Sequence, residues 1–257
     1  MIRRLSKIFK EDGKTVIVAM DHGMGLSVNP ALDKTGEILE AIVAGGADAI
    51  LTTYGIANRY QDVLRNVGLI LRMDGGSSSL NSDNECPELL YTVEDALKIG
   101  ADAMACMGFP GAPYEHKCMK NVAELAARGR EWGIPLMAEM LPGGFDPSIP
   151  NNVDNLVLSA RTGCEYGANI IKTSFAGTAE EYKRVIDASY QPVVVLGGEK
   201  TSDLQSLFVC LESAMTAGAA GVAIGRNVWK HSDPEKVTRA LVDLVHGGKK
   251  AADIQGL

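Results

Sequence analysis

The chain has 257 residues, of which 46% are hydrophobic and 22% charged, and its formal net charge is −7 at pH 7. This length allows one large α/β domain or two small domains, and the composition is typical of a soluble globular protein. The acidic balance argues against a nucleic-acid-binding protein, which would carry a basic patch, but it allows a locally positive pocket for an anionic substrate.

The sequence carries no pattern that would direct the chain to a membrane or out of the cell. No apolar run approaches the length that spans a bilayer, and the basic segment 1–14 lacks the apolar core of a secretory signal. The five cysteines are scattered, odd in number and without a CxxC pair, which is typical of reduced thiols rather than of disulfides or a zinc site. We therefore expect a cytoplasmic protein.

Short apolar runs alternate with helical patterns along the whole chain. The predicted strands cover residues 15–20, 48–53, 69–74, 102–107, 135–141, 168–175, 192–196 and 221–224. The predicted helices cover residues 32–44, 57–66, 92–99, 114–132, 152–166, 179–188, 202–217 and 234–245. The polar segment 75–88 is predicted to be a long functional loop, and the tail 247–257 is expected to fray.

Eight strand-then-helix units follow one another without a segment that resembles a linker. This alternation predicts a parallel sheet covered on both faces, within a single domain that spans residues 1–257. Eight units in about 250 residues match the size of a (β/α)8 TIM barrel. A doubly wound open sheet is the alternative, but the first strand–helix turn reads DHGMGL and lacks the GxGxxG pattern.

Lys172 lies near the end of an otherwise apolar predicted strand, ANIIKTSF. Burial disfavours the charged form of an amine, and a neutral amine is the nucleophile that Schiff-base chemistry requires. The alternative is that the strand ends at this point and the ammonium group reaches solvent. In a TIM barrel the active site lies at the carboxyl ends of the strands, which is where Lys172 is predicted to lie together with Asp21, His22, Asp74, Glu139 and Arg226.

Glu139 departs from the polar residues expected at strand ends because it lies inside the apolar run LMAEML. A carboxyl group in this position should be partly desolvated, and its pKa should lie near neutrality, which suits proton transfer. The alternative is a structural ion pair, for instance with Lys172.

The ends of the seventh and eighth predicted strands carry Gly197-Gly198 and Gly225-Arg226. Glycines let backbone N–H groups approach an anion, and a short helix beginning near Asn227 would point its positive end at the same place. Arg226 could add a forked contact to phosphate oxygens. The four histidines lack metal-binding spacing, so no metal is expected, although His22 beside Asp21 could supply one ligand or one hydrogen bond.

Four motifs lie at the predicted strand ends: Asp21-His22-Gly23, Ile171-Lys172-Thr173, Gly197-Gly198-Glu199-Lys200 and Gly225-Arg226-Asn227-Val228-Trp229. Together they resemble the archaeal-type class I fructose-bisphosphate aldolase family, a group of DeoC-like aldolases. The wider group includes an autoinducer-2-related thiolase and a transaldolase-like synthase. The resemblance extends over nearly the whole chain.

The resemblance implies a metal-independent aldolase that needs no cofactor because its substrate binds covalently. It implies that Lys172 forms the Schiff base and that Asp21 orients the substrate or assists proton transfer. Phosphate and substrate contacts are expected from Gly197, Gly198, Gly225, Arg226 and the adjacent His22. The resemblance also implies a homo-oligomer, with a decamer among the expected forms.

One feature departs from the family pattern. Members usually carry Tyr-Pro-Arg-Gly at the end of strand 5, with the tyrosine as acid and base, whereas this chain reads Leu141-Pro142-Gly143-Gly144. Glu139 lies two residues earlier, on the same face of the strand, and the arrangement is similar to class I tagatose-bisphosphate aldolases that shuttle a proton through a glutamate.

The predicted function is that of a class I aldolase acting on a phosphorylated ketose. A thiolase or transaldolase-type synthase on the same scaffold is one alternative. A non-catalytic sugar-phosphate-binding regulator is another, although such a protein would have little reason to bury an amine.

Overall fold

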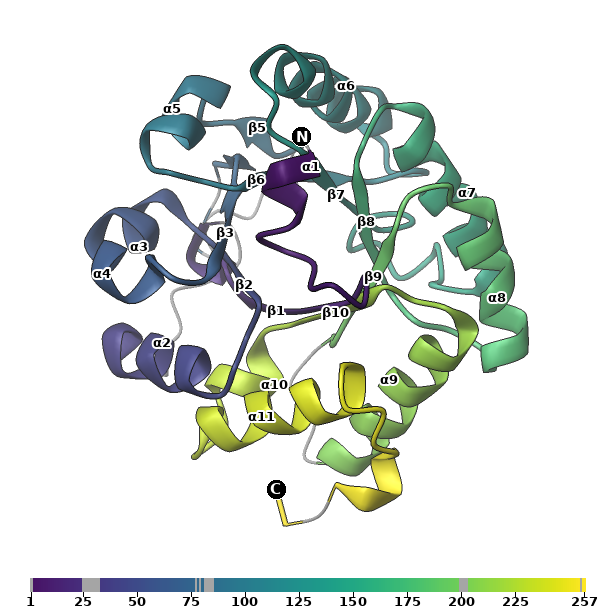
Figure 1. The fold of residues 1–257 in the computed structure, drawn as a ribbon. Helices are drawn as coiled ribbons and strands as arrows, with labels where there is room; N and C mark the ends of the chain where they lie inside the picture. Colours follow the sequence, from purple (N-terminus) through teal and green to yellow (C-terminus); the bar gives the residue numbers. More distant parts are fainter. Residues whose placement is uncertain are drawn as a thin grey trace.

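The computed structural model describes residues 2–24, 33–76, 78, 80, 86–198, 203–254 and 256–257. Within these residues, parallel strands close into a barrel in the order β1-β10-β9-β8-β7-β6-β3-β2 (Figure 1). The barrel strands are β1 (Thr15–Met20), β2 (Ala49–Thr52), β3 (Gly68–Arg72), β6 (Ala103–Gly108), β7 (Leu136–Met140), β8 (Ile170–Thr173), β9 (Val193–Leu196) and β10 (Gly221–Ile224). The predicted (β/α)8 barrel is therefore confirmed.

Helices surround the barrel and connect its strands (Figure 1). They are α2 (Thr35–Ala44), α3 (Tyr54–Arg59), α4 (Gln61–Leu64), α5 (Val93–Lys98), α6 (Glu115–Trp132), α7 (Val153–Glu165), α8 (Ala179–Ala188), α9 (Leu204–Ala217), α10 (Arg226–Trp229) and α11 (Pro234–Val245). Side-chain caps define several of the starts, because Thr92 and Thr178 form capping boxes with Asp95 and Glu181. None of the helices formed by the described residues is long and apolar enough to cross a membrane.

Side chains along each barrel strand alternate between the helix layer and the barrel interior. In β1, Val16 and Val18 join the core beneath the helices, whereas Ile17 and Ala19 belong to the interior cluster. The N-terminal segment, with helix α1 (Ile2–Leu5), lies across one end of the barrel (Figure 1). Its fully buried Ile8 joins the interior cluster, so this end of the barrel is filled with apolar side chains.

Two predicted elements differ from the structure near the third strand. The predicted helix 57–66 is replaced by α3 and α4, and α3 begins at Tyr54 because the Thr53 hydroxyl accepts a hydrogen bond from the Ile56 N–H at 3.3 Å. The predicted strand 69–74 ends at Arg72, and Asp74–Gly75 forms β4, which pairs with β5 (Glu88–Leu89) in an antiparallel ladder. The predicted loop 75–88 thus begins and ends in this ladder, and its residues 77, 79 and 81–85 lie outside the described residues.

The C-terminal tail does not fray in its described part. It contains a short 3-10 helix, Ala251–Asp253, and Ala251 is buried. The Ala251 carbonyl accepts a 2.8 Å hydrogen bond from Gln205 Nε2, and the Ala251 N–H donates one of 2.8 Å to Glu212. These contacts hold the tail against α9.

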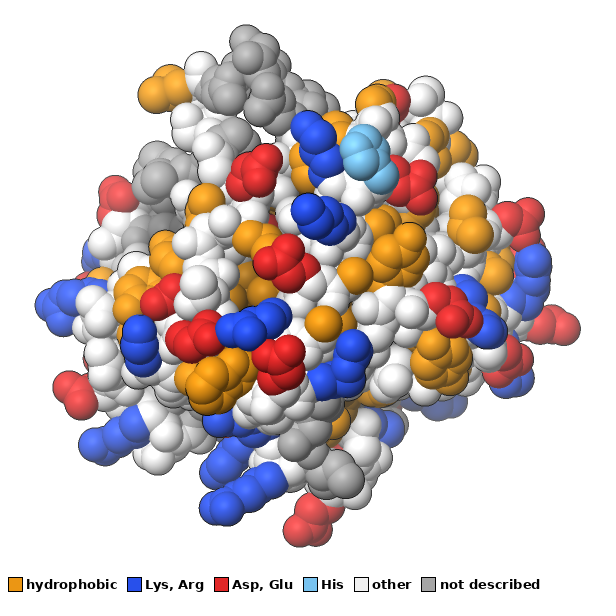
Figure 2. Space-filling view, turned by 90° about the horizontal axis from the view of Figure 1, so that it is seen from above, with side chains coloured by type: hydrophobic (Ala, Val, Ile, Leu, Met, Phe, Trp, Pro, Cys, Tyr) orange, Lys and Arg blue, Asp and Glu red, His pale blue; other side chains and the backbone are white. Residues whose placement is uncertain are grey.

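Charged side chains of both signs are mixed across the described surface that Figure 2 shows, on the side of the barrel where α6 lies. The basic side chains do not gather into one broad area on this face. The expectation that the chain does not bind nucleic acid stays a prediction.

Candidate active site

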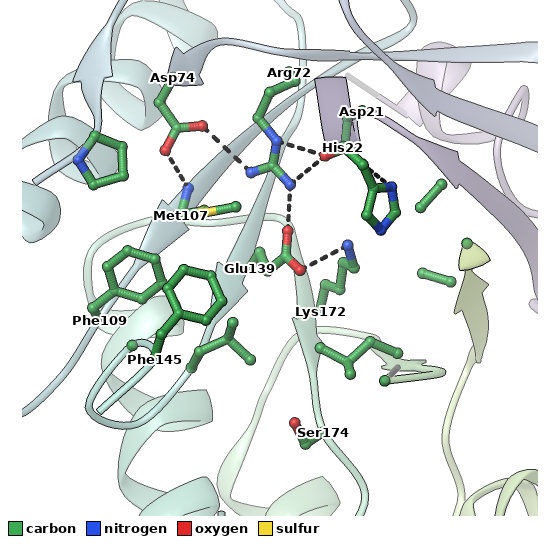
Figure 3. Close-up of a pocket in the computed structure, with 18 of the residues that line it drawn as sticks. Asp21, His22, Arg72, Asp74, Met107, Phe109, Glu139, Phe145, Lys172 and Ser174 are labelled. Carbon is green, nitrogen blue, oxygen red and sulfur yellow. Dashed lines mark hydrogen bonds and ion pairs between the residues drawn. The ribbon is translucent and has the colours of Figure 1, made fainter. Parts of the chain in front are cut away.

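Strand alternation places a charged layer directly above the apolar interior of the barrel. In four strands the interior residue is apolar, and the next inward residue, two positions later, is charged: Ala19 precedes Asp21, Ile70 precedes Arg72, Met137 precedes Glu139 and Ile170 precedes Lys172. The charged side chains converge on one another in Figure 3. They lie at the carboxyl ends of the strands, as predicted for a TIM-barrel active site.

Lys172 is buried in this layer, with only 4% of its surface exposed. Its Nζ atom lies 2.8 Å from Glu139 Oε1. The two residues are direct neighbours in register because β7 and β8 pair in parallel. The alternative that the ammonium group reaches solvent is therefore wrong, and the ion pair with Glu139 that was kept as an alternative is present.

Arg72 is at the centre of the charged layer, and sequence reasoning did not single it out. Its guanidinium contacts three carboxyl groups: Nη2 lies 2.6 Å from Asp21 Oδ2, Nη1 lies 3.3 Å from Asp74 Oδ1, and Nη2 also donates to Glu139 Oε2. The Asp74 carboxyl in turn accepts a 2.8 Å hydrogen bond from the Met107 N–H. The signal was available, because Arg72 interrupts an apolar run in the same way as Lys172 does.

The network determines the charge of its carboxyl groups. Burial alone raises the pKa of Asp21, but the Arg72 guanidinium and the Lys172 ammonium outweigh burial and lower that pKa to about 2. The pKa of Glu139 is also lowered, because Lys172 and Arg72 together outweigh its burial. The expectation of a Glu139 carboxyl poised near neutrality is therefore wrong, since both of its oxygens face a cation. Asp74 is farther from the guanidinium, and burial raises its pKa.

The predicted phosphate-binding residues lie together at the ends of β9 and β10. Gly225 is in close contact with its neighbours, because a Cβ added there would lie 2.6 Å from His22 Cε1 and 2.8 Å from the Ala19 carbonyl oxygen. The Gly197 carbonyl accepts a 3.1 Å hydrogen bond from Asn227 Nδ2, which ties the two strand ends together. The short helix α10 begins at Arg226. Glu199 and Lys200 of the third motif lie outside the described residues.

His22 lies between the charged layer and these glycines. Its Nδ1 atom is 3.8 Å from Asp21 Oδ1, and its ring packs edge-on against Trp229 with centroids 5.3 Å apart. Burial lowers the pKa of His22 despite the nearby Asp21 carboxylate. The imidazole is therefore neutral near pH 7 and suited to hydrogen bonding rather than to ion pairing.

A cavity of about 620 Å³ joins the charged layer to the strand-end glycines. The cavity is also lined by Phe109, Tyr114, Leu141 and Phe145, which we define as the aromatic wall. Phe109 makes T-shaped contacts with Phe145 and Tyr114 at centroid distances of 5.6 and 6.1 Å. Among the described side chains, no group of three or more His, Cys, Asp or Glu could hold a metal ion.

Comparison with known proteins agrees with this geometry. Residues 15–231 match the DeoC/LacD family of aldolases. The chain belongs to this family. The resemblance drawn from the strand-end motifs is thus confirmed.

Two curated relatives match almost the whole chain. The 2-amino-3,7-dideoxy-D-threo-hept-6-ulosonate synthase of Halobacterium salinarum is 34% identical over 244 residues, which cover 95% of this chain and 90% of the relative. The class 1 fructose-bisphosphate aldolase of Thermoproteus tenax is 30% identical over 259 residues, covering 98% and 97%. A solved Schiff-base-forming fructose-1,6-bisphosphate aldolase superposes with a TM-score of 0.85 at 28% identity, covering 95% of this chain and 98% of that structure.

Proposed function

We propose that this chain is a class I aldolase that makes or breaks a carbon–carbon bond in a phosphorylated ketose through a Schiff base on Lys172. The observation that carries the proposal is the 2.8 Å contact between the buried Lys172 amine and the Glu139 carboxylate. The solved family member that forms a Schiff base supports the same chemistry. The side chains around this pair determine the substrate specificity.

Glu139 activates the lysine in the proposed reaction. Its ionised carboxylate accepts a proton from the Lys172 ammonium, and the neutral amine then attacks the substrate carbonyl. Protonated Glu139 then returns this proton to the carbinolamine hydroxyl, which leaves as water and gives an iminium ion. The positive nitrogen of the iminium ion withdraws electrons from the adjacent carbon–carbon bond. Glu139 is the base that removes the hydroxyl proton as this bond breaks, and it later returns a proton to the enamine carbon.

Arg72 is a positioning residue in this proposal. It holds one oxygen of Glu139, so the other oxygen, Oε1, points at Lys172 Nζ. It also holds Asp21, whose pKa of about 2 makes it a hydrogen-bond acceptor for a substrate hydroxyl rather than a proton carrier. This fixed arrangement replaces the missing tyrosine at Leu141.

The phosphate of the substrate binds at the ends of β9 and β10. Gly197, Gly198 and Gly225 expose backbone to the cavity, and Arg226 and the neutral His22 line the same side. Binding there holds the reacting carbon against Lys172, which accelerates the reaction through positioning. The proposed enzyme assembles as a homo-oligomer, for which a decamer remains a prediction.

A second candidate function is a synthase that transfers the Lys172-bound fragment to another carbonyl acceptor. The Halobacterium salinarum relative favours it, because that protein is named a synthase and is 34% identical to this chain. The two candidates share the Schiff base and differ in the acceptor.

Borohydride trapping tests the proposal. The enzyme is incubated with dihydroxyacetone phosphate, reduced with sodium borohydride and digested for peptide mass mapping. We expect a reduced adduct on Lys172, and a Lys172→Arg control that carries none. A protein that gives no Lys172 adduct with any phosphorylated ketone or aldehyde would not be a class I aldolase.

A Glu139→Gln variant tests the proton carrier, because glutamine keeps the shape of the side chain and removes the base. We expect kcat to fall by about 10²–10⁴-fold, the usual contribution of general acid–base catalysis. Full turnover by this variant would overturn the role assigned to Glu139.

A further inference from the structure

The aromatic wall differs in chemistry from the phosphate-binding side of the same cavity. Figure 3 shows Phe109 and Phe145 on the side of Glu139 away from Lys172. Phe109 is almost completely buried, but Phe145 is 50% exposed, although it packs against Phe109. A half-exposed phenylalanine that lines a cavity presents apolar surface to whatever occupies that cavity.

Basic side chains are unevenly distributed along the cavity. Among its described lining residues, the permanently basic ones are Arg72, Lys172 and Arg226. Arg72 is surrounded by three carboxyl groups, Lys172 forms the covalent bond, and Arg226 lies on the phosphate-binding side. In the charged layer, carboxyl groups outnumber basic side chains by three to two.

The four residues of the aromatic wall carry no positive charge, and neither does Pro87, which lines the cavity with them. A second phosphate at the aromatic wall would lose water without gaining a cation, which makes its burial unfavourable. An apolar group in the same place would bury surface of both partners.

We propose that the substrate carries a single phosphate, held beside Arg226, and that the end of the molecule against the aromatic wall is uncharged and apolar. This inference rests on the proposed Schiff-base function and narrows its substrate class. The enzyme then releases or accepts an uncharged aldehyde at the wall, not a phosphorylated one. The assignment sets this chain apart from an aldolase that cleaves a bisphosphate.

The direct test is a competition between acceptors in the direction of synthesis. Wild-type enzyme receives saturating dihydroxyacetone phosphate and, as acceptor, butanal, D-glyceraldehyde or D-glyceraldehyde 3-phosphate. We expect the highest kcat/KM with butanal and a value at least tenfold lower with glyceraldehyde 3-phosphate. A preference for glyceraldehyde 3-phosphate over butanal would overturn the inference.

A pair of variants locates the apolar end on the wall. Phe145→Lys supplies the missing cation on the side of Glu139 away from Lys172, whereas Phe145→Leu keeps an apolar side chain and serves as the matched control. Phe145→Lys should shift the butanal to glyceraldehyde 3-phosphate ratio at least tenfold toward the phosphorylated aldehyde, and Phe145→Leu less than threefold. Equal ratios in both variants would show that the acceptor does not reach the wall.

Borohydride trapping separates failure of this inference from failure of the function. If dihydroxyacetone phosphate is trapped on Lys172 while glyceraldehyde 3-phosphate is the better acceptor, the aldolase stands and the single-phosphate assignment is wrong. If no phosphorylated carbonyl compound is trapped on Lys172, both fall together.

Discussion

The two ends of the barrel interior use the same strands for opposite purposes. At the N-terminal end, Ile8 and the first inward residues of the strands form an apolar cluster. Two residues farther along the same strands, Asp21, Arg72, Glu139 and Lys172 form a buried ionic network. A step of two residues keeps a side chain on the same face of a strand. The apolar layer that stabilises the barrel and the charged layer that carries the chemistry are therefore only two residues apart along each strand.

The difference shows how charges can be buried in a barrel. Burying a charge without a partner is strongly unfavourable. Removing either partner of a buried ion pair therefore destabilises the folded protein. The charged layer provides such partners through Arg72, which contacts Asp21 just after β1, Asp74 in β4 and Glu139 in β7. The apolar layer needs only close packing. Substitutions in one layer can therefore be tested for their effect on the stability or activity that depends on the other layer.

Lys172→Met should have the largest effect. The change removes the nucleophile, so we expect turnover to fall by about 10⁴-fold or more, as for other enzymes that lose a nucleophile. Arg72 still pairs with Glu139, so the fold should persist, although with a lower free energy of unfolding because Glu139 loses one of its two partners. Steady-state rates and circular dichroism measure the two outcomes, and appreciable turnover by a folded Lys172→Met protein would contradict the Schiff-base assignment.

Arg72→Met should lower both stability and activity. Loss of one partner from a buried ionic network typically costs about 3–5 kcal/mol of unfolding free energy. Because the carboxyl groups left behind can accept protons, the loss measured by urea unfolding should be smaller at pH 5 than at pH 8. Arg72→Lys is the matched control, and it should lose less stability because it keeps the charge. A loss that does not change with pH would point to packing alone.

Ile8→Ala tests the apolar layer by itself. Removal of a buried aliphatic side chain leaves a cavity and costs about 2–5 kcal/mol. The charged layer is not touched, so borohydride trapping on Lys172 should proceed at the wild-type rate in the absence of denaturant. Slower trapping in a fully folded variant would show that the two layers are coupled.

Acid titration should show the smallest effect. The pKa of Asp21 falls from 3.8 to about 2 on folding, which corresponds to a stabilisation of about 2 kcal/mol. A lowered pKa means that this stabilisation is complete above the unfolded value and is lost as the pH falls from about 4 towards 2. The difference in unfolding free energy between wild type and Asp21→Asn should therefore shrink over this range. A difference independent of pH would contradict the ionised state of Asp21.

Much of the fold followed from local patterns. The bounds predicted for residues 15–20, 179–188 and 221–224 agree with β1, α8 and β10, because apolar runs, helix caps and glycines act through near neighbours. Lys172, Glu139 and the strand-end glycines could be placed in one site because the carboxyl ends of parallel strands meet at one end of a barrel. The start of α3 at Tyr54 depended on the Thr53 cap, which the apolar periodicity did not indicate.

The properties of the site were decided by contacts between residues far apart in the chain. Arg72 reaches Asp21 across 51 positions and Glu139 across 67. No local pattern reports such a contact, so sequence reasoning placed Glu139 near neutrality. The position of Arg72 inside an apolar run could have indicated its burial, but not its partners. The aromatic wall likewise joins residues that follow β6 to residues that follow β7. The sequence alone determined the barrel and its lysine, and only the tertiary structure decided the charge of the carboxyl groups, because charge in a buried site depends on which partners surround it.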